Sequence, residues 1–260
     1  MSIRGMVAAE RAQLIEMLRG LSEDEWETPS LCAGWRVRDV AGHLMYDTYS
    51  PLAYAVLTVK CLGSVDKTNE AIVTASARLS TGELVDALEH RAGRLSRFAP
   101  QLLLADLMVH QQDIRRPLGR SRDIPEERLI TVLNHPDPFA RPGRRTKGLR
   151  FVATDVSWSS GDGPEVRGPG EALALAMVGR TAALDDLTGE GVAELRRRCA
   201  REQARPGSRG RWVRACRPPC VLSRECPSVV GERTTDGADV VTCRFGRRCG
   251  PRRTLGSPRG

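Results

Sequence analysis

The sequence predicts a mainly α-helical fold: a bundle of about four long helices, then a small α+β extension, then a basic tail. Apolar residues recur at helical spacing through the first 135 residues. A segment rich in proline and glycine follows, and after it come β-branched and aromatic runs that indicate strands. The tail differs in composition, because residues 201–260 carry 14 arginines, no lysine and five of the eight cysteines.

The first part of the chain reads as a series of helices separated by turn residues. We expect a helix over residues 7–21. Ser22 and Glu25 then form a capping-box pattern for a short helical turn, which Pro29 ends. The next helix is expected over residues 36–49, where valine, alanine and leucine recur on one face.

Further helices are expected over residues 51–61, from Ser80 onward, over residues 101–116 and over residues 126–133. Ser80 and Glu83 form a second capping box. The apolar residues assigned to the buried face of that helix are Leu84, Leu88, Leu95 and Phe98.

Beyond His135 the pattern changes. Residues 148–158 predict a strand, a turn precedes a short strand at Val166, and residues 170–187 predict an apolar helix. The predicted domains are therefore a metal-binding helical bundle over 1–135, an α+β extension over 136–199 and a tail over 200–260.

Charge is concentrated in the tail. Residues 201–260 have a net charge of +9, whereas residues 1–200 hold 26 basic and 27 acidic residues. The cysteine spacing in the tail does not fit paired zinc knuckles, and the tail contains no histidine. We interpret it as a disordered segment that arose by frameshift or read-through.

Composition also excludes several classes of protein. The N-terminal segment is interrupted by Arg4, Glu10 and Arg11, so it lacks a signal-peptide core. The best apolar run, residues 52–59, is too short to cross a bilayer. Aromatic residues make up 4% of the chain, which argues against a stacking platform for single-stranded nucleic acid. We expect a cytoplasmic protein without membrane partners, in which only the tail offers phosphate contacts.

Three side chains on two predicted helices are candidates for a metal site. His43 lies at the edge of the apolar stripe of helix 36–49. Asp106 and His110 are four residues apart on helix 101–116, so they share one face. Two histidines and one carboxylate leave an open position on zinc, and the same set suits iron(II) or nickel. Asp113 lies three residues beyond His110 and is a candidate to orient its ring.

Ordinary structural roles remain open for the same residues. Asp106 and His110 can be a simple surface pair, which contributes a few tenths of a kcal/mol. Asp113 can pair with a neighbouring arginine, and His43 can be a hydrogen-bonded core residue.

Two motifs resemble a known family. The segment "LSEDEW…PSLCAGWRVRDVAGHL" and the segment "DLMVHQQDIRRPLG" are similar to signatures of the mycothiol-dependent maleylpyruvate isomerase family, within the DinB-like metal-binding superfamily. The resemblance extends from about Val7 to Cys199. It implies a DinB-like four-helix bundle whose ligands are His43, Asp106 and His110, with zinc as the usual metal. That family has glutamate at the carboxylate position, where this chain has the shorter Asp106.

The resemblance implies a thiol-dependent isomerase or S-transferase that uses mycothiol and acts on a small electrophile. It also implies that Arg180 faces an anionic substrate, although a surface arginine is the simpler interpretation. The alternative function is a non-catalytic module that binds a metal or ligand. The sequence identifies neither the electrophile nor the oligomeric state.

Overall fold

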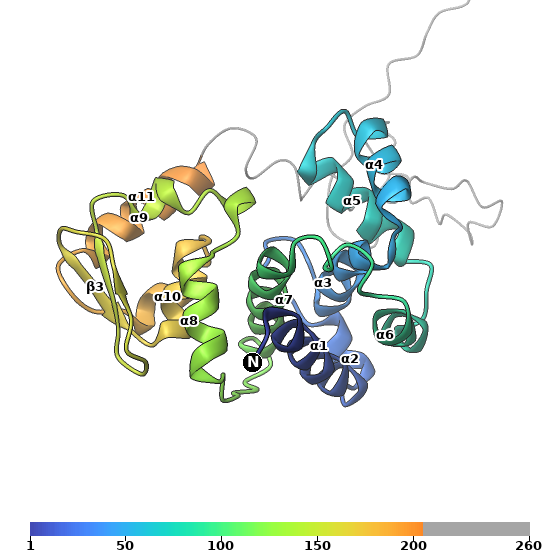
Figure 1. Cartoon of the computed structure of the whole chain (residues 1–260), viewed down its shortest axis with the longest axis horizontal. Coiled ribbons are helices and arrows are strands. Elements are labelled where there is room, and N and C mark those ends of the chain that lie inside the picture. The colour runs from blue at the N-terminus through green and yellow to red at the C-terminus, as the bar shows by residue number, and fades with distance from the viewer. Residues whose placement is uncertain (205–260) are drawn as a thin grey trace, which may run out of the picture. The chain divides into compact units, whose positions relative to one another are not determined.

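The computed structural model describes residues 1–204 and confirms the predicted fold class (Figure 1). A helical part formed by α1 to α7 precedes a smaller part that holds a three-stranded sheet. Within the described range, no helix combines the length and apolar character needed to cross a membrane. The predicted disordered tail lies outside the described residues, except for its first five residues, which end helix α11 (Val192–Ala204).

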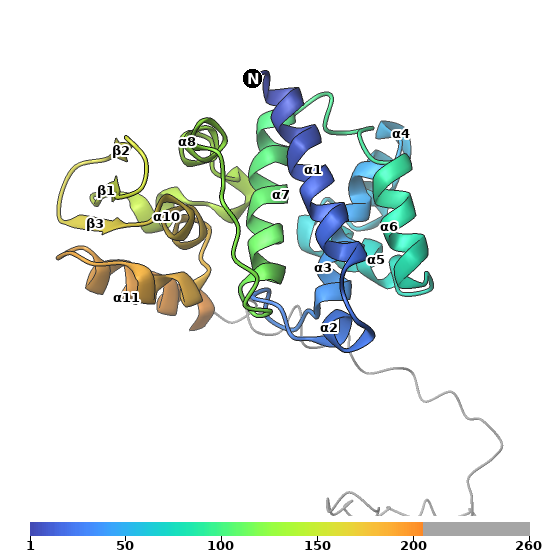
Figure 2. The same cartoon turned by 90° about the horizontal axis from the view of Figure 1, so that it is seen from below.

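Helices α1 (Ile3–Arg19) and α7 (Pro100–Arg115) lie side by side and form the centre of the helical part (Figure 2). Helix α6 (Thr81–His90) packs on α1, and α3 (Val37–His43) packs on α7. The shorter helices of this part are α2 (Glu23–Glu27), α4 (Pro51–Lys60) and α5 (Val65–Ser76).

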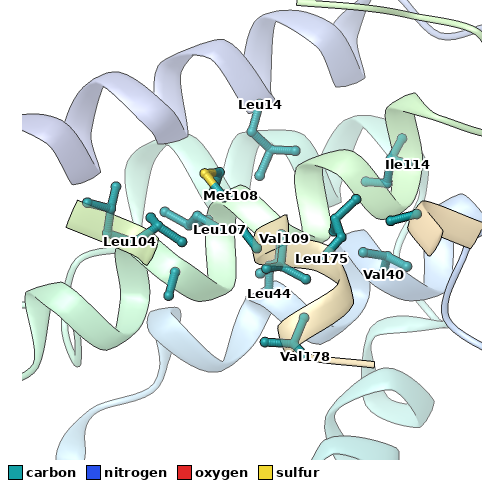
Figure 3. Packing of buried hydrophobic residues seen from close by; sticks show 14 of the residues in the cluster. Leu14, Val40, Leu44, Leu104, Leu107, Met108, Val109, Ile114, Leu175 and Val178 are labelled. Atoms are coloured by element: carbon teal, nitrogen blue, oxygen red, sulfur yellow. The ribbon is translucent and has the colours of Figure 1, made fainter. Parts of the chain in front are cut away.

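A single apolar cluster joins both parts of the protein. Figure 3 shows Leu14 of α1, Val40 of α3 and Met108 of α7 in this cluster, together with Leu175 from the extension. All four side chains are fully buried. The burial of this apolar surface is the main stabilising contribution to the fold.

The two predicted capping boxes are both present. Ser22 accepts the N–H of Glu25, and the Glu25 carboxylate accepts the N–H of Ser22, at the start of α2. Ser80 and Glu83 make the same reciprocal pair at the start of α6. These local signals were sufficient to place both helix starts.

The predicted extent of α6 was wrong. The helix ends at His90, so Leu95 and Phe98 are not on it, and Phe98 is 68% exposed. Gly93 has a φ of 104°, which stops the helix. The buried Asp47 carboxylate then holds the next turn, because it accepts the backbone N–H groups of Gly93, Leu95 and Ser96.

The segment predicted as one helix over 36–49 changes its geometry after His43. Helix α3 is followed directly by a 3₁₀ segment, η1 (Leu44–Thr48). Each turn of a 3₁₀ helix holds three residues, so side chains three apart lie one above the other. This change aligns His43 with Tyr46.

Helix α8 (Glu126–Asn134) packs both on α7 and on the apolar helix α10 (Gly170–Met177), so it connects the helical part to the extension. Strand β1 (Arg150–Ala153) is central in the sheet order β2-β1-β3. It pairs antiparallel with β2 (Ser159–Ser160), where Phe151 faces Ser160, and parallel with β3 (Glu165–Gly168), where Phe151 faces Val166. The remaining elements are η2 (Pro138–Ala140), α9 (Gly143–Thr146) and η3 (Thr181–Asp186).

The predicted helix over 170–187 is divided by Gly179, which has a φ of 91°. A Cβ atom at this position would lie 2.7 Å from the guanidinium of Arg145. The chain therefore turns after α10, and Arg180 becomes the N-cap residue of η3. This turn directs Arg180 back toward α7.

Candidate metal centre

His43 is the last residue of α3 and is buried, with 5% relative exposure of the residue. Val40 of the same helix and Leu44, the first residue of η1, are buried in the core and fix the orientation of this segment. Asp39 begins the helix by accepting the backbone N–H of Arg36. A helix that needs its apolar face for packing thus carries a histidine at its buried end.

Asp106 and His110 lie one turn apart on α7 and face His43. The Nε2 atom of His110 is 3.3 Å from Oδ1 of Asp106, and the Nε2 atom of His43 is 3.9 Å from Oδ2. The two imidazole rings are 4.8 Å apart. One potential ligand atom from each residue lies within 4.8 Å of the other two. The structure therefore brings together the three predicted metal ligands.

Asp113 fixes the orientation of His110. The Nδ1 atom of His110 is 2.9 Å from Oδ2 of Asp113, whose carboxylate is fully buried. A carboxylate ion only accepts hydrogen bonds, so Nδ1 of His110 must be the donor. This leaves Nε2 of a neutral His110 as an acceptor that faces another acceptor, Oδ1 of Asp106. Either a proton on Nε2 or a metal cation between these two atoms resolves the conflict.

Arg180 and Cys32 complete the surroundings of Asp113. The Nε and Nη2 atoms of Arg180 donate to Asp113 at 2.9 and 2.8 Å. The Cys32 thiol donates to Oδ2 of Asp113 at 3.0 Å, and its Sγ atom is 3.4 Å from Nη2 of Arg180. All three guanidinium nitrogens of Arg180 thus donate to protein groups, and the bond from Nη1 is the weakest of them. Its predicted role toward a substrate depends on Nη1, which lies 3.5 Å from the carbonyl oxygen of Val178.

Cys32, His110 and Asp113 form a second set of potential ligands within 4.8 Å. The guanidinium of Arg180 already contacts Cys32 and Asp113. Its positive charge therefore takes the place that a metal ion would have in this second set. The set with His43 and Asp106 has no such cation within ion-pair distance among the described residues. It is therefore the better candidate for a metal ion.

Two residues of the site were not predicted from the sequence. The hydroxyl of Tyr46 donates to Oδ2 of Asp106 at 2.7 Å, and its ring lies 5.4 Å from the ring of His43. Tyr46 follows His43 by three residues, a spacing that could have indicated it. Cys32 is 78 residues from His110 in the chain, so helical spacing gave no signal for it.

Burial and neighbouring charges shift the pKa values of these groups. Burial lowers the pKa of His43, which favours its neutral form. Burial opposes ionisation of Asp106, but the charge of His110 outweighs it, so the pKa of Asp106 is lowered. In the same way, the charge of Asp106 outweighs burial and raises the pKa of His110. The centre thus holds an ionised carboxylate and the neutral imidazole of His43, whereas a metal ion would have to displace the proton from Nε2 of His110.

The residues fit a divalent cation. Nδ1 of the buried His43 has no hydrogen-bond partner among the described residues, and its Nε2 atom lies beyond hydrogen-bond distance from Asp106. A buried ring nitrogen without a hydrogen bond costs free energy. Binding of a cation at Nε2, which faces Asp106, would offset this cost. Two imidazoles and one carboxylate are ligands that zinc accepts while it keeps an open position.

The other two histidines lie outside the centre. His90 is exposed at the end of α6, where it pairs with Glu89 at 3.4 Å. His135 is the exposed residue that follows α8. Both are therefore suitable as controls in experiments on His43 and His110.

These observations define a helical domain with a candidate centre of two histidines and one carboxylate. Residues 7–115 match the family model of the mycothiol maleylpyruvate isomerase N-terminal domain. The match confirms the family resemblance over this segment, which contains every residue of the centre except Arg180. No curated protein sequence gives a significant match.

Two solved structures resemble the chain. A crystal structure of a histidine-to-alanine mutant of the mycothiol-dependent maleylpyruvate isomerase has a TM-score of 0.51 at 15% identity. A second crystal structure of the mycothiol-dependent maleylpyruvate isomerase has a TM-score of 0.48 at 16% identity. Each comparison covers 73% of this chain and 93% of the other. The first likeness establishes that this chain shares the fold of that isomerase.

Proposed function

We propose that this protein binds a divalent metal through His43, Asp106 and His110, and that it is a thiol-dependent isomerase or S-transferase. The metal is proposed to be zinc, and the thiol to be mycothiol or a similar small thiol. The observation that carries the proposal is the convergence of Nε2 of His110 on Oδ1 of Asp106 at 3.3 Å, beside the buried His43, whose Nδ1 atom has no hydrogen-bond partner among the described residues.

The chain's own residues would prepare this reaction. A bound divalent cation would supply the Lewis acidity that keeps a coordinated thiol deprotonated at neutral pH. His43, Asp106 and His110 would hold that cation, and the hydrogen bond from Nδ1 of His110 to Asp113 would leave Nε2 free to bind it. The thiol sulfur would add to an electrophilic carbon of a substrate double bond and be eliminated again after isomerisation. In a transfer it would instead displace a leaving group, which departs with the electron pair of its bond to that carbon.

The metal content of the full chain, purified without a histidine tag, tests the first half of the proposal. The four histidines allow matched controls. We expect about one equivalent of metal in the parent, in His90→Ala and in His135→Ala, and almost none in His43→Ala or His110→Ala. If His43→Ala and His110→Ala keep the metal content of the controls, the proposed centre is wrong.

A second experiment separates an enzyme from a binding module. A cobalt(II)-substituted sample is titrated with a small thiol, and the visible absorption is recorded. The enzyme proposal predicts a new thiolate-to-cobalt charge-transfer band that is absent in His110→Ala. An unchanged spectrum would favour a non-catalytic metal-binding module, which is also compatible with the engagement of Arg180 by Asp113.

A further inference from the structure

Asp106 has a shorter side chain than the glutamate it replaces in the family motif, and the hydroxyl of Tyr46 holds its carboxylate in place. Each of its oxygen atoms has a different neighbour: Oδ1 faces Nε2 of His110 at 3.3 Å, and Oδ2 accepts the hydroxyl of Tyr46 at 2.7 Å. The bond to Tyr46 is the shorter contact. It restricts rotation of the carboxylate about its last bond, which would otherwise interchange the two oxygen atoms.

The backbone places Tyr46 for this contact. The helix changes to 3₁₀ geometry directly after His43, so the two side chains lie on the same side of the segment. Their rings are 5.4 Å apart, and the ring of Tyr54 from α4 lies 6.4 Å from that of Tyr46. A regular α-helix would rotate residue 46 by about 60° away from residue 43 around the axis.

We propose that Tyr46 is a positioning residue of the metal centre, which holds Oδ2 of Asp106 and so presents Oδ1 of this short side chain to the cation. This inference rests on the proposed metal site. Groups that hydrogen-bond to a metal ligand orient it, and their loss typically weakens metal affinity 10- to 100-fold. A phenol is well suited to the role here because its rigid ring spans the distance from η1 to α7.

The test compares Tyr46→Phe with Tyr54→Phe in the full chain. Both variants remove one hydroxyl and keep the aromatic ring, but the hydroxyl of Tyr46 donates to Asp106. Zinc affinity is measured by competition with a chromophoric chelator, and the cobalt(II) absorption spectrum reports ligand geometry. We expect Tyr46→Phe to bind zinc about tenfold or more weakly, with an altered cobalt spectrum, and Tyr54→Phe to match the parent.

Replacing Asp106 by the longer glutamate should make zinc affinity less dependent on Tyr46. In the Asp106→Glu background, we expect Tyr46→Phe to change zinc affinity by less than about threefold. An equal loss in both backgrounds would overturn the link to the short side chain. An unchanged affinity and spectrum in the single variant Tyr46→Phe would overturn the positioning role.

The outcome distinguishes this inference from the proposed function. If the parent binds neither zinc nor cobalt, both are overturned; if it binds both metals and Tyr46→Phe is identical, this inference alone fails. Should Tyr46→Phe not fold, the parent still provides a test, because the chain has three tyrosines. Zinc should then produce a tyrosine difference spectrum that persists in Tyr49→Phe and in Tyr54→Phe, and its absence would overturn the role of Tyr46.

Discussion

Replacing Asp113 by asparagine should damage both the stability of the fold and the affinity for metal. The carboxylate is fully buried and receives hydrogen bonds from His110, from Cys32 and twice from Arg180, at 2.8–3.0 Å. Asparagine keeps the shape but removes the charge, so Arg180 loses its ion-pair partner. Breaking a buried ion pair from one side costs about 3–5 kcal/mol, and we expect the lower end because Arg180 is partly exposed.

A loss of about 3 kcal/mol corresponds to a decrease in melting temperature of roughly 6–12 °C for a protein of this size. The measurement is thermal unfolding of the metal-free full chain, and Asp123→Asn, which changes an exposed acidic residue, is the control. Zinc affinity of Asp113→Asn should fall 10- to 100-fold, because the amide no longer fixes the tautomer of His110. A melting temperature and a zinc affinity within error of Asp123→Asn would refute this account of the site.

The lowered pKa of Asp113 predicts how the stability effect of Asp113→Asn changes with pH. Burial opposes ionisation of Asp113, but the charge of Arg180 outweighs it, so the pKa of Asp113 is lowered in the folded protein. Its contribution to stability is therefore complete above the unfolded pKa of about 3.9 and is lost as the pH falls toward the lower folded value. The difference in unfolding free energy between the parent and Asp113→Asn should shrink below about pH 4. A difference that stays constant from pH 7 to pH 3 would contradict this explanation.

Three further substitutions test the packing around the centre. Glu10→Gln should cost about 3–5 kcal/mol in urea unfolding, because it leaves the buried Arg128 without its carboxylate at 2.6 Å. Asp47→Asn should increase hydrogen exchange of the backbone amides of residues 93–96, whose N–H groups the carboxylate accepts; unchanged protection would refute this. Gly42→Ala should destabilise the fold by about 1–3 kcal/mol, because its Cβ atom would lie 2.2 Å from Oγ of Ser76, and Ser76→Ala should recover part of this loss.

Local signals in the sequence predicted most helix starts correctly, because a capping box or a helix-opening proline acts within a few residues. Tertiary contacts decided the rest. The end of α6 depends on Asp47, which is more than forty residues earlier in the chain. Helix α5 was not predicted, because only Thr68, Ile72 and Ser76 of its side chains are buried and two of these are polar.

Some residues of the candidate site could likewise be predicted from the sequence, whereas others depend on tertiary contacts. Asp106, His110 and Asp113 could be grouped from the sequence because they share one face of α7. His43 was added from another predicted helix because two histidines and one carboxylate form a metal-ligand set, and the structure places it beside them. The contact of Tyr46 with Asp106 joins residues 60 apart, and that of Arg180 with Asp113 joins residues 67 apart. Helical periodicity relates residues within one helix, so it carries no information about these contacts between different elements.

The contacts of Asp113 also bear on where the functional unit ends. The family match stops at residue 115, directly after α7. Yet the charge that balances the buried Asp113 comes from Arg180, which the turn at Gly179 directs back from the extension. The helical domain alone would therefore leave a buried carboxylate without its cation, next to the histidine that it orients. The extension is thus part of the electrostatic environment of the centre, and variants at Gly179 should affect metal affinity although they lie far from the ligands in the sequence.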